Sequence, residues 1–326
     1  MRSVPSGSFE RFTSPAALWR AWCDHARGKA RRPAVAAFAL DVDRHVFALA
    51  RALAAGSYRP APYHQHVVRD PKLRLISAPD LRDRILHQAI VAELGPHFTR
   101  SYIDDSFACL PGRGPQRAVL RHLAFTRRHT FRLALDVARY FPSIDHDIAL
   151  EILRHRLRDR RTTDLLAILL HHGGEVYDTA LAREILGQPG VPGRGLPIGS
   201  CLSQWLANLY LDGVDHLIKR TLKVRAYLRY MDDLVLFADD RAALADARAA
   251  ITAWLAEHRR LSLGPSHIVD AREPCTFLGY RVSPSGLSAG KKMRRRLPPR
   301  VRAAARRGPR ALERTLQSYR ALVVFG

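Results

Sequence analysis

Lysine is scarce in this chain of 326 residues, since only six of its 53 Lys and Arg residues are lysine. Together with abundant alanine, this bias indicates a GC-rich genome and lowers the weight of arginine content taken alone. Acidic residues are also few, at 30 Asp and Glu, so the formal net charge is +23. An excess of this size survives the correction for genome bias and predicts a polyanionic partner, in the first place a nucleic acid.

Cysteine and long apolar runs are also lacking. The four cysteines, Cys23, Cys109, Cys201 and Cys275, form no CxxC pair, which argues against a zinc site or a disulfide framework and fits a reducing compartment. No apolar run reaches the roughly 18 residues that a membrane span needs, and the N-terminus has no signal-peptide core. We therefore expect a cytoplasmic protein without membrane contact.

Hydrophobic periodicity and turn signals predict an α+β protein with an antiparallel central sheet. Asp80 is a plausible N-cap for the helix that follows it. The expected elements are helices over 15–55, a β-ribbon over 57–79, a helix from 80, a strand over 130–137, a helix over 146–171, a loop over 186–200, a helix over 200–221, a hairpin over 224–238, a helix over 241–258, further short strands, and a basic tail after Gly290.

The stretch "RYMDDLVLF" (229–237) places two adjacent carboxylates, Asp232 and Asp233, inside an apolar hairpin. One interpretation is a polar turn, where aspartate is common. The other is a metal site, because two carboxylates in a buried hairpin repel each other unless a cation neutralises them. Mg²⁺ binds one or two carboxylates and fills its remaining positions with water and substrate phosphates.

A second carboxylate follows a strand in "LALDVARYFPSIDH", where Asp136 precedes Tyr140 and Phe141. Asp136 is either a turn or capping residue or a further metal ligand beside Asp232. In the second case two ions about 4 Å apart would activate an attacking hydroxyl and stabilise a leaving oxygen in phosphoryl transfer.

The third element is "GLPIGSCLSQ" (195–204). Gly195 and Gly199 permit a close backbone approach, Ser200 and Ser203 are predicted helix caps, and Gln204 offers hydrogen bonds to a base or sugar. An ordinary loop-to-helix junction is the alternative interpretation.

The three stretches, in this order and spacing, resemble motifs A, B and C of reverse transcriptases. The segments "DPKLRLISAPDLRDRILHQAIV", "DSFACLPGRGPQRAV" and "TFLGYRVSPSG" resemble the fingers ribbon with its helix, a second fingers segment and the primer grip. The resemblance implies a right-hand polymerase with fingers, palm and a small basic helical thumb. The implied division is 1–56, an N-terminal helical segment packing on the fingers; 57–129, fingers; 130–285, palm; and 286–326, thumb.

Within that family the chain looks most like the reverse transcriptases of diversity-generating retroelements, which read Ile-Gly-x-x-x-Ser-Gln in motif B. The matching text is Ile198 to Gln204. We also expect none of the appended endonuclease, maturase or RNase H domains of other relatives. The resemblance implies an error-prone enzyme that misincorporates opposite template adenines. It also implies a structured cognate RNA and a small basic accessory protein oligomer as partners, besides template RNA, primer, cDNA strand and dNTPs.

The resemblance assigns roles around the reaction. Asp136, Asp232 and Asp233 match the catalytic carboxylates, with the Val137 carbonyl as an additional ligand to two Mg²⁺ ions, for which Mn²⁺ is the expected substitute. The incoming nucleotide would be contacted by fingers, motif A and motif B residues: Lys72, Arg74, Phe141, Ile198, Gly199 and Gln204. Phe141 would exclude a 2′-hydroxyl, and Lys72 and Arg74 would contact the triphosphate unless they lie on a solvated ribbon face.

Three further assignments follow. His267 stands where the family usually has a lysine proposed as general acid, so it is either that acid or a bystander. Leu278, Gly279 and Tyr280 match the primer grip. The basic tail matches the thumb and would bind template–primer phosphates, unless it is a disordered arm; its leading cations are Lys291, Lys292, Arg294, Arg295 and Arg296.

Two other functions remain open from the sequence. A retron-like or anti-phage defence reverse transcriptase would share the catalytic residues and differ in its template and priming. A non-catalytic RNA-binding protein on a polymerase scaffold would need no such carboxylates, so the presence of all three argues against it.

Overall fold

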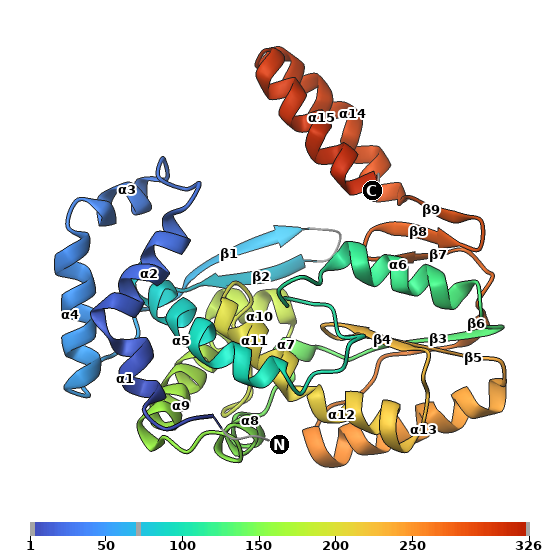
Figure 1. Ribbon diagram of the computed structural model, residues 1–326, viewed down its shortest axis with the longest axis horizontal. Helices are drawn as coiled ribbons and strands as arrows, with labels where there is room; N and C mark the ends of the chain where they lie inside the picture. The colour runs from blue at the N-terminus through green and yellow to red at the C-terminus, as the bar shows by residue number, and fades with distance from the viewer. Residues whose placement is uncertain (1–3, 70–72, 324–326) are drawn as a thin grey trace. The chain divides into compact units, whose positions relative to one another are not determined.

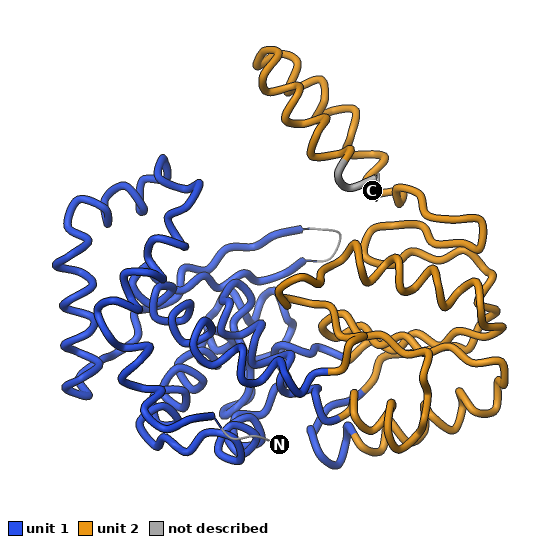
Figure 2. The backbone as a smooth tube through the Cα atoms, viewed as in Figure 1, with its two compact units in different colours: residues 1–102, 138–213, 255–262 blue, residues 103–137, 214–254, 263–326 orange. Residues whose placement is uncertain are grey.

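The computed structural model describes residues 4–69 and 73–323 (Figure 1). Two compact units divide the chain (Figure 2), and each is made of three discontinuous segments. Unit 1 comprises residues 1–102, 138–213 and 255–262; unit 2 comprises 103–137, 214–254 and 263–326. Each unit is described separately below, and the four-part division predicted from the sequence stays a prediction.

Unit 1 consists of helices around one β-ribbon. The ribbon is antiparallel, pairing β1 (His64–Arg69) with β2 (Leu73–Ala78), as the alternation over 57–79 predicted. The helices are α1 (Ser8–Thr13), α2 (Pro15–Ala26), α3 (Pro33–Ala39), α4 (Val42–Ala54), α5 (Leu81–Thr99), α7 (Tyr140–Ser143), α8 (His146–Arg154), α9 (Arg160–Gly174), α10 (Ala180–Leu186) and α11 (Cys201–Tyr210), with a 3₁₀ turn at Glu175–Tyr177.

Helix α5 is largely buried within unit 1, and its buried positions include the polar residues Asp83 and His87 as well as apolar ones. Its Ile85, Leu86 and Ile90 side chains are fully buried, and α1, α2 and α11 all pack against it. Asp80 caps the helix, since its carboxylate accepts a hydrogen bond from the Arg82 amide at 2.9 Å. The predicted N-cap is confirmed.

Unit 2 is built on a four-stranded antiparallel sheet of order β4-β5-β3-β6. Its strands are β3 (Phe131–Asp136), β4 (Tyr227–Tyr230), β5 (Asp233–Ala238) and β6 (Ile268–Asp270). A second sheet of order β7-β8-β9 follows, formed by β7 (Cys275–Phe277), β8 (Tyr280–Ser283) and β9 (Gly286–Ala289). The predicted hairpin over 224–238 is therefore present as β4 and β5.

Helix α6 (Pro115–Thr126) covers one face of the four-stranded sheet. Alternate residues of the hairpin, Leu228, Val235 and Phe237, form a core with this helix and with the second sheet. The intervening residues Leu234 and Leu236 are fully buried on the opposite face, as the period-two alternation of strands requires. The strands of the hairpin are largely apolar, with Arg229 as the exception, because residues on both of their faces are buried.

Two predicted helices are interrupted. The helix expected over 146–171 divides into α8 and α9, because Asp159 caps a new helix through the amides of Arg161 and Thr162. The helix expected over 200–221 breaks at Leu211 into α11, α12 (Asp212–His216) and a π-helical turn, Leu217–Thr221. The helix expected over 241–258 is present as α13 (Arg241–Arg259).

The basic tail forms two helices that pack on each other, α14 (Lys291–Arg306) and α15 (Pro309–Val323). Residues 291–323 are therefore helical, and the alternative of a disordered arm is wrong for them. Within the described ranges, no helix combines the length and the apolar character needed to cross a bilayer.

Candidate active site

Asp136 and Asp233 are register partners on neighbouring strands of unit 2. Asp136 ends β3, Asp233 begins β5, and the two strands are antiparallel. Directly opposite residues of an antiparallel pair have their Cβ atoms about 4.5–5.5 Å apart on the same face of the sheet. Asp232 lies one residue earlier, in the two-residue turn between Tyr230 and Asp233. The fold therefore brings the three predicted carboxylates of unit 2 to one end of one sheet.

The end of β3 that carries Asp136 is exposed, although Val235 on the same face of the sheet is buried against α6. Asp136 and Ala134 are the exposed residues of β3, while Leu133 and Leu135 are buried. Asp232 and Asp233 are half-buried. The sequence predicted Asp232 and Asp233 at the tip of a buried hairpin, and the structure places them there, at the turn between β4 and β5. Accessible carboxylates at this position can bind a cation that also contacts a substrate.

The backbone after Asp136 is held by the segment that leads into β6. The Gly264 amide donates to the Asp136 carbonyl oxygen at 2.8 Å, and Val137 forms a β-bridge with Leu263. A Cβ on Gly264 would lie 3.5 Å from that carbonyl oxygen and 4.0 Å from Oδ2 of Asp136. Glycine at 264 therefore leaves room beside the Asp136 carboxylate.

The donor set suits a hard divalent cation. Aspartate oxygens with open positions for water and phosphate are what Mg²⁺ prefers, whereas zinc sites favour nitrogen and sulfur. Within the described residues, no three His, Cys, Asp or Glu side chains converge closely enough to enclose a metal ion. The role of Asp136, Asp232 and Asp233 as metal ligands therefore stays a prediction.

The remaining predicted residues of unit 2 lie directly before β6, at the turn between β7 and β8, and on α14. His267 is exposed and directly precedes β6, whose Ile268 pairs with Leu133. Leu278 and Gly279 form the turn between β7 and β8, with φ angles of 48° and 86°. Tyr280 is buried, and burial raises the pKa of its hydroxyl.

Lys291, Arg294 and Arg295 are exposed in the first turns of α14, and Lys292 and Arg296 are half-buried. This distribution leaves most of the predicted phosphate-binding cations accessible.

In unit 1 the loop before α11 is fixed by its backbone. The Ser77 amide of β2 donates to the Ile198 carbonyl at 2.8 Å. Gly199 has φ of 130°, and a Cβ there would lie 3.1 Å from the Ser77 carbonyl oxygen. Gly195 has φ of 103°, and a Cβ would lie 2.5 Å from the Tyr177 ring. The close approaches predicted for both glycines are confirmed.

The loop leaves some predicted side chains accessible and buries one. Gln204 is exposed, and the side chains of Ile198 and Phe141 are half-buried. Arg74 is exposed on β2, while Lys72 lies outside the described residues. Ser200 caps α11 by accepting from the Leu202 amide at 3.2 Å. Ser203 is buried inside α11, so its prediction as a cap is wrong.

Two buried histidines that the sequence did not single out hold the same loop. His87 Nδ1 lies 2.9 Å from Ser200 Oγ, and burial, followed by nearby His172, lowers the pKa of His87 to about 3. His146 Nε2 lies 2.8 Å from the Gly195 carbonyl oxygen. Their positions on helices give no signal in the sequence, because a buried histidine and an exposed one look alike there.

A buried ion pair in unit 2 was also missed. Arg229 and Asp215 are both fully buried, and Arg229 interrupts the apolar run "AYLRYM" that enters the hairpin. A cation within a buried strand requires a carboxylate partner, so the sequence held a signal for the pair without identifying Asp215.

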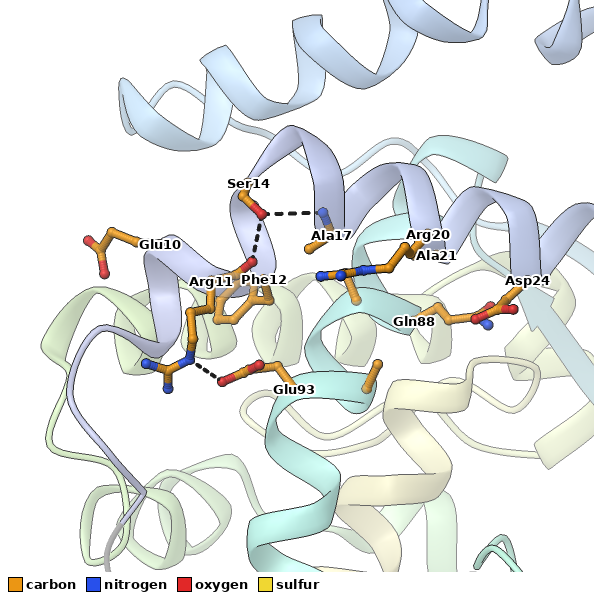
Figure 3. Close-up of a pocket in the computed structure, with 12 residues that line it drawn as sticks. Glu10, Arg11, Phe12, Ser14, Ala17, Arg20, Ala21, Asp24, Gln88 and Glu93 are labelled. Atoms are coloured by element: carbon orange, nitrogen blue, oxygen red, sulfur yellow. Dashed lines mark hydrogen bonds and ion pairs between the residues drawn. The ribbon is translucent and has the colours of Figure 1, made fainter.

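A separate pocket of about 650 Å³ lies in unit 1 between α1, α2 and α5 (Figure 3). Small side chains such as Ala17, Ala21 and Ala89 line it, and the Arg11–Glu93 ion pair at 2.5 Å borders it. The predicted site residues are not among its lining residues, so this pocket is not the candidate active site.

Comparisons with known proteins agree with this geometry. The model of the family described as "Reverse transcriptase (RNA-dependent DNA polymerase)" matches residues 68–282, more than half of the chain. Protein YkfC of Escherichia coli (strain K12) is 24% identical over 271 residues, covering 71% of this chain and 69% of that protein.

Among solved structures, telomerase from Candida albicans, in complex with a fragment of telomeric RNA, is similar with a TM-score of 0.51 and 10% identity. The match covers 71% of this chain and 47% of the telomerase chain, so the chain spans about half the length of that protein. Together with the family match, this likeness confirms the α+β fold of right-hand polymerase type.

Proposed function

Because the chain belongs to the reverse transcriptase family, whose members are RNA-dependent DNA polymerases, we propose that it copies an RNA template into cDNA by adding dNTPs to a primer. The observation that carries this proposal is the grouping of Asp136, Asp232 and Asp233 at one end of the unit 2 sheet. A protein that only binds RNA gains nothing from placing like charges in register, since directly opposed carboxylates destabilise a sheet.

Asp136 and Asp232 would hold two Mg²⁺ ions, with the Val137 carbonyl as a further ligand and Asp233 in support. When bound, such ions lower the pKa of the attacking hydroxyl and neutralise charge on the leaving group. The chain's own contribution is to hold these carboxylates in place, through β3, β5 and the hydrogen bond from the Gly264 amide to Asp136.

The other roles follow the family resemblance. Lys72 and Arg74 would bind the triphosphate, Arg74 by two parallel hydrogen bonds, and Phe141 would select the deoxyribose sugar by excluding a 2′-hydroxyl. His267 would donate a proton to the pyrophosphate leaving group. Leu278, Gly279 and Tyr280 would position the primer end, and the cations of α14 would neutralise template–primer phosphates.

We further propose that the enzyme is of the diversity-generating type, error-prone at template adenines. Ile198 supports this, because an isoleucine offers shape and apolar contact where a glutamine would offer hydrogen bonds, and recognition by hydrogen bonds discriminates far better than apolar fit. The loop backbone is held by Ser77 independently of the side chain at 198. A structured cognate RNA and a small basic accessory protein oligomer are the partners that this type implies.

The test is primer extension on an RNA template with Mg²⁺ and four dNTPs, followed by sequencing of the cDNA, with Asp232→Asn as the inactive control. Extension with errors concentrated at template adenines supports both parts of the proposal. Accurate cDNA supports the polymerase and favours a retron-like or defence enzyme. If the wild type and Asp232→Asn bind RNA equally and neither makes cDNA, even with cognate RNA and accessory protein added, the chain is a binding protein and the proposal is wrong.

A further inference from the structure

The hairpin turn that carries Asp232 has an unfavourable backbone conformation. Met231 has φ of 57°, in the left-handed region that costs a residue with a side chain about 1–2 kcal/mol. Two-residue hairpin turns with a positive φ usually place Gly, Asn or Asp there. A methionine at this position needs support from the surrounding structure.

Arg229 supplies that support from the strand leading into the turn. Its Nη1 donates to the Met231 carbonyl oxygen at 3.1 Å. This oxygen belongs to the peptide unit that joins Met231 to Asp232. Because a peptide unit is planar, fixing its carbonyl limits the backbone rotation that sets where the Asp232 side chain begins.

Asp215 in turn fixes the guanidinium of Arg229. Arg229 Nε lies 2.8 and 3.0 Å from the two Asp215 oxygens, and Nη2 lies 2.7 Å from Oδ2. The Tyr227 hydroxyl donates to the same carboxylate at 2.6 Å. Both charged side chains are fully buried, so water does not compete with these bonds, and the arginine has little freedom to move.

The main chain of Arg229 is anchored as well. Its amide donates to the Asp105 carbonyl at 2.9 Å, and its carbonyl accepts from the Phe107 amide at 3.0 Å. Arg229 is therefore fixed at both its backbone and its guanidinium, and the Nη1 hydrogen bond transmits this rigidity to the turn.

We infer that Arg229, held by Asp215, is a positioning residue that orients Asp232 for binding the divalent ion. The inference rests on the proposed function, in which Asp232 is a metal ligand. Buried ion pairs contribute little net stability compared with apolar residues of the same shape. A role in geometry explains why an ion pair stands beneath this turn.

The test compares Mn²⁺ binding, measured by electron paramagnetic resonance, in complexes with a dideoxy-terminated template–primer and the next dNTP. Arg229→Lys keeps a cation beside Asp215, but a lysine ammonium lacks the rigid fork that reaches both the carboxylate and the Met231 carbonyl. Tyr227→Phe is the matched control, because it removes one hydrogen bond to Asp215 and leaves the Arg229 hydrogen bond to the turn.

Arg229→Lys is expected to weaken Mn²⁺ binding roughly 10- to 100-fold, the usual effect of losing a residue that orients a metal ligand. The Mg²⁺ concentration for half-maximal extension should rise in parallel, while template–primer affinity stays unchanged. Tyr227→Phe should lower the melting temperature and leave Mn²⁺ binding as in the wild type. Wild-type Mn²⁺ binding by Arg229→Lys, or equal weakening in both variants, would overturn the inference.

If circular dichroism shows that Arg229→Lys does not fold, Mn²⁺ binding by the Asp215→Glu variant tests the inference instead. This variant keeps both charges and displaces the guanidinium by one methylene group. Weakened Mn²⁺ binding by folded Asp215→Glu supports the inference, and wild-type binding overturns it. Asp232→Asn separates this result from the proposed function: if it binds Mn²⁺ as the wild type does, Asp232 is no metal ligand and the proposed function fails first.

Discussion

Asp136 and Asp233 stand directly opposite each other on antiparallel strands. Their mutual repulsion lowers the stability of the free protein and increases its attraction for a cation. Like charges in directly opposite positions destabilise a strand pair by roughly 0.2–1 kcal/mol. A bound divalent ion removes this cost by neutralising both groups.

Asp233→Asn should therefore raise the melting temperature in EDTA slightly and lower primer extension. For Asp136→Asn we expect the same gain in stability and a larger loss of activity, on the order of 10³-fold, because metal ligation contributes several kcal/mol to the transition state. Asp239→Asn, directly after the far end of β5, is the control and should leave extension unchanged. Lower stability of Asp233→Asn in EDTA would contradict the repulsion.

Replacing Ile198 by glutamine should raise fidelity at template adenines by roughly tenfold, which corresponds to about 1.4 kcal/mol and to one added hydrogen bond. Sequencing of cDNA from a defined RNA template measures the error frequency. Ile198→Leu, an apolar change of similar size, should keep the wild-type errors. Identical error spectra for the glutamine and leucine variants would show that the side chain at 198 does not control fidelity.

Gly195→Ala should destabilise the protein by about 2–4 kcal/mol, the sum of a left-handed backbone and overpacking against a neighbour. The neighbour is the Tyr177 ring, 2.5 Å from the position of the new Cβ. Gly193→Ala is the matched control: its φ of 71° is also positive, but its Cβ would have nothing within 4 Å. Urea unfolding measures the free energy of unfolding of both variants. If Gly195→Ala and Gly193→Ala lose the same stability, the contact with Tyr177 is unimportant.

Stability should fall as the pH drops below 6.5, in part because of His87. Its folded pKa of about 3 lies below the ordinary histidine value of 6.5, so the unfolded chain binds a proton that the folded chain excludes. The contribution of His87 is fully present above pH 6.5 and is lost as the pH falls towards 3. Between pH 7.5 and pH 5 this loss is about 2 kcal/mol.

His87→Asn tests this contribution, because an asparagine can keep the hydrogen bond to Ser200 without titrating. The variant should be less stable at pH 7.5 and show a smaller loss between pH 7.5 and pH 5 in urea unfolding. The exposed His66→Asn serves as the control. An unchanged loss in His87→Asn would show that His87 is not responsible.

Replacing Arg294 and Arg295 by glutamine should weaken template–primer binding and reduce its salt dependence. Removing one cation that neutralises a phosphate lowers the slope of log K against log salt by about one. Fluorescence anisotropy at several salt concentrations measures the slope. Arg160→Gln removes an exposed arginine on α9 and should leave the slope unchanged. An unchanged slope in the Arg294 and Arg295 variant would place α14 outside the nucleic-acid interface.

The sequence by itself determined the ribbon, the hairpin, the cap at Asp80 and the close approaches at Gly195 and Gly199. Alternation and capping residues act through neighbours a few positions away, and such local effects can be predicted from sequence. The two glycines marked a close approach without identifying the partners, which are Ser77 for Gly199 and Tyr177 for Gly195. The sequence also singled out Asp136, Asp232 and Asp233, because acidic residues beside apolar strands stand out from their surroundings, and the structure brings them to one end of a sheet. Their catalytic role stays a prediction.

Only the tertiary structure decided which residues hold these features in place. The break at Leu211, the burial of Ser203, the pairing of His87 with Ser200 and of Arg229 with Asp215 depend on packing between segments distant in sequence. The register that sets Asp136 against Asp233 is likewise a property of two strands about a hundred residues apart in the chain. Burial decides whether a polar group must find a partner, and burial arises only when the distant segments pack together.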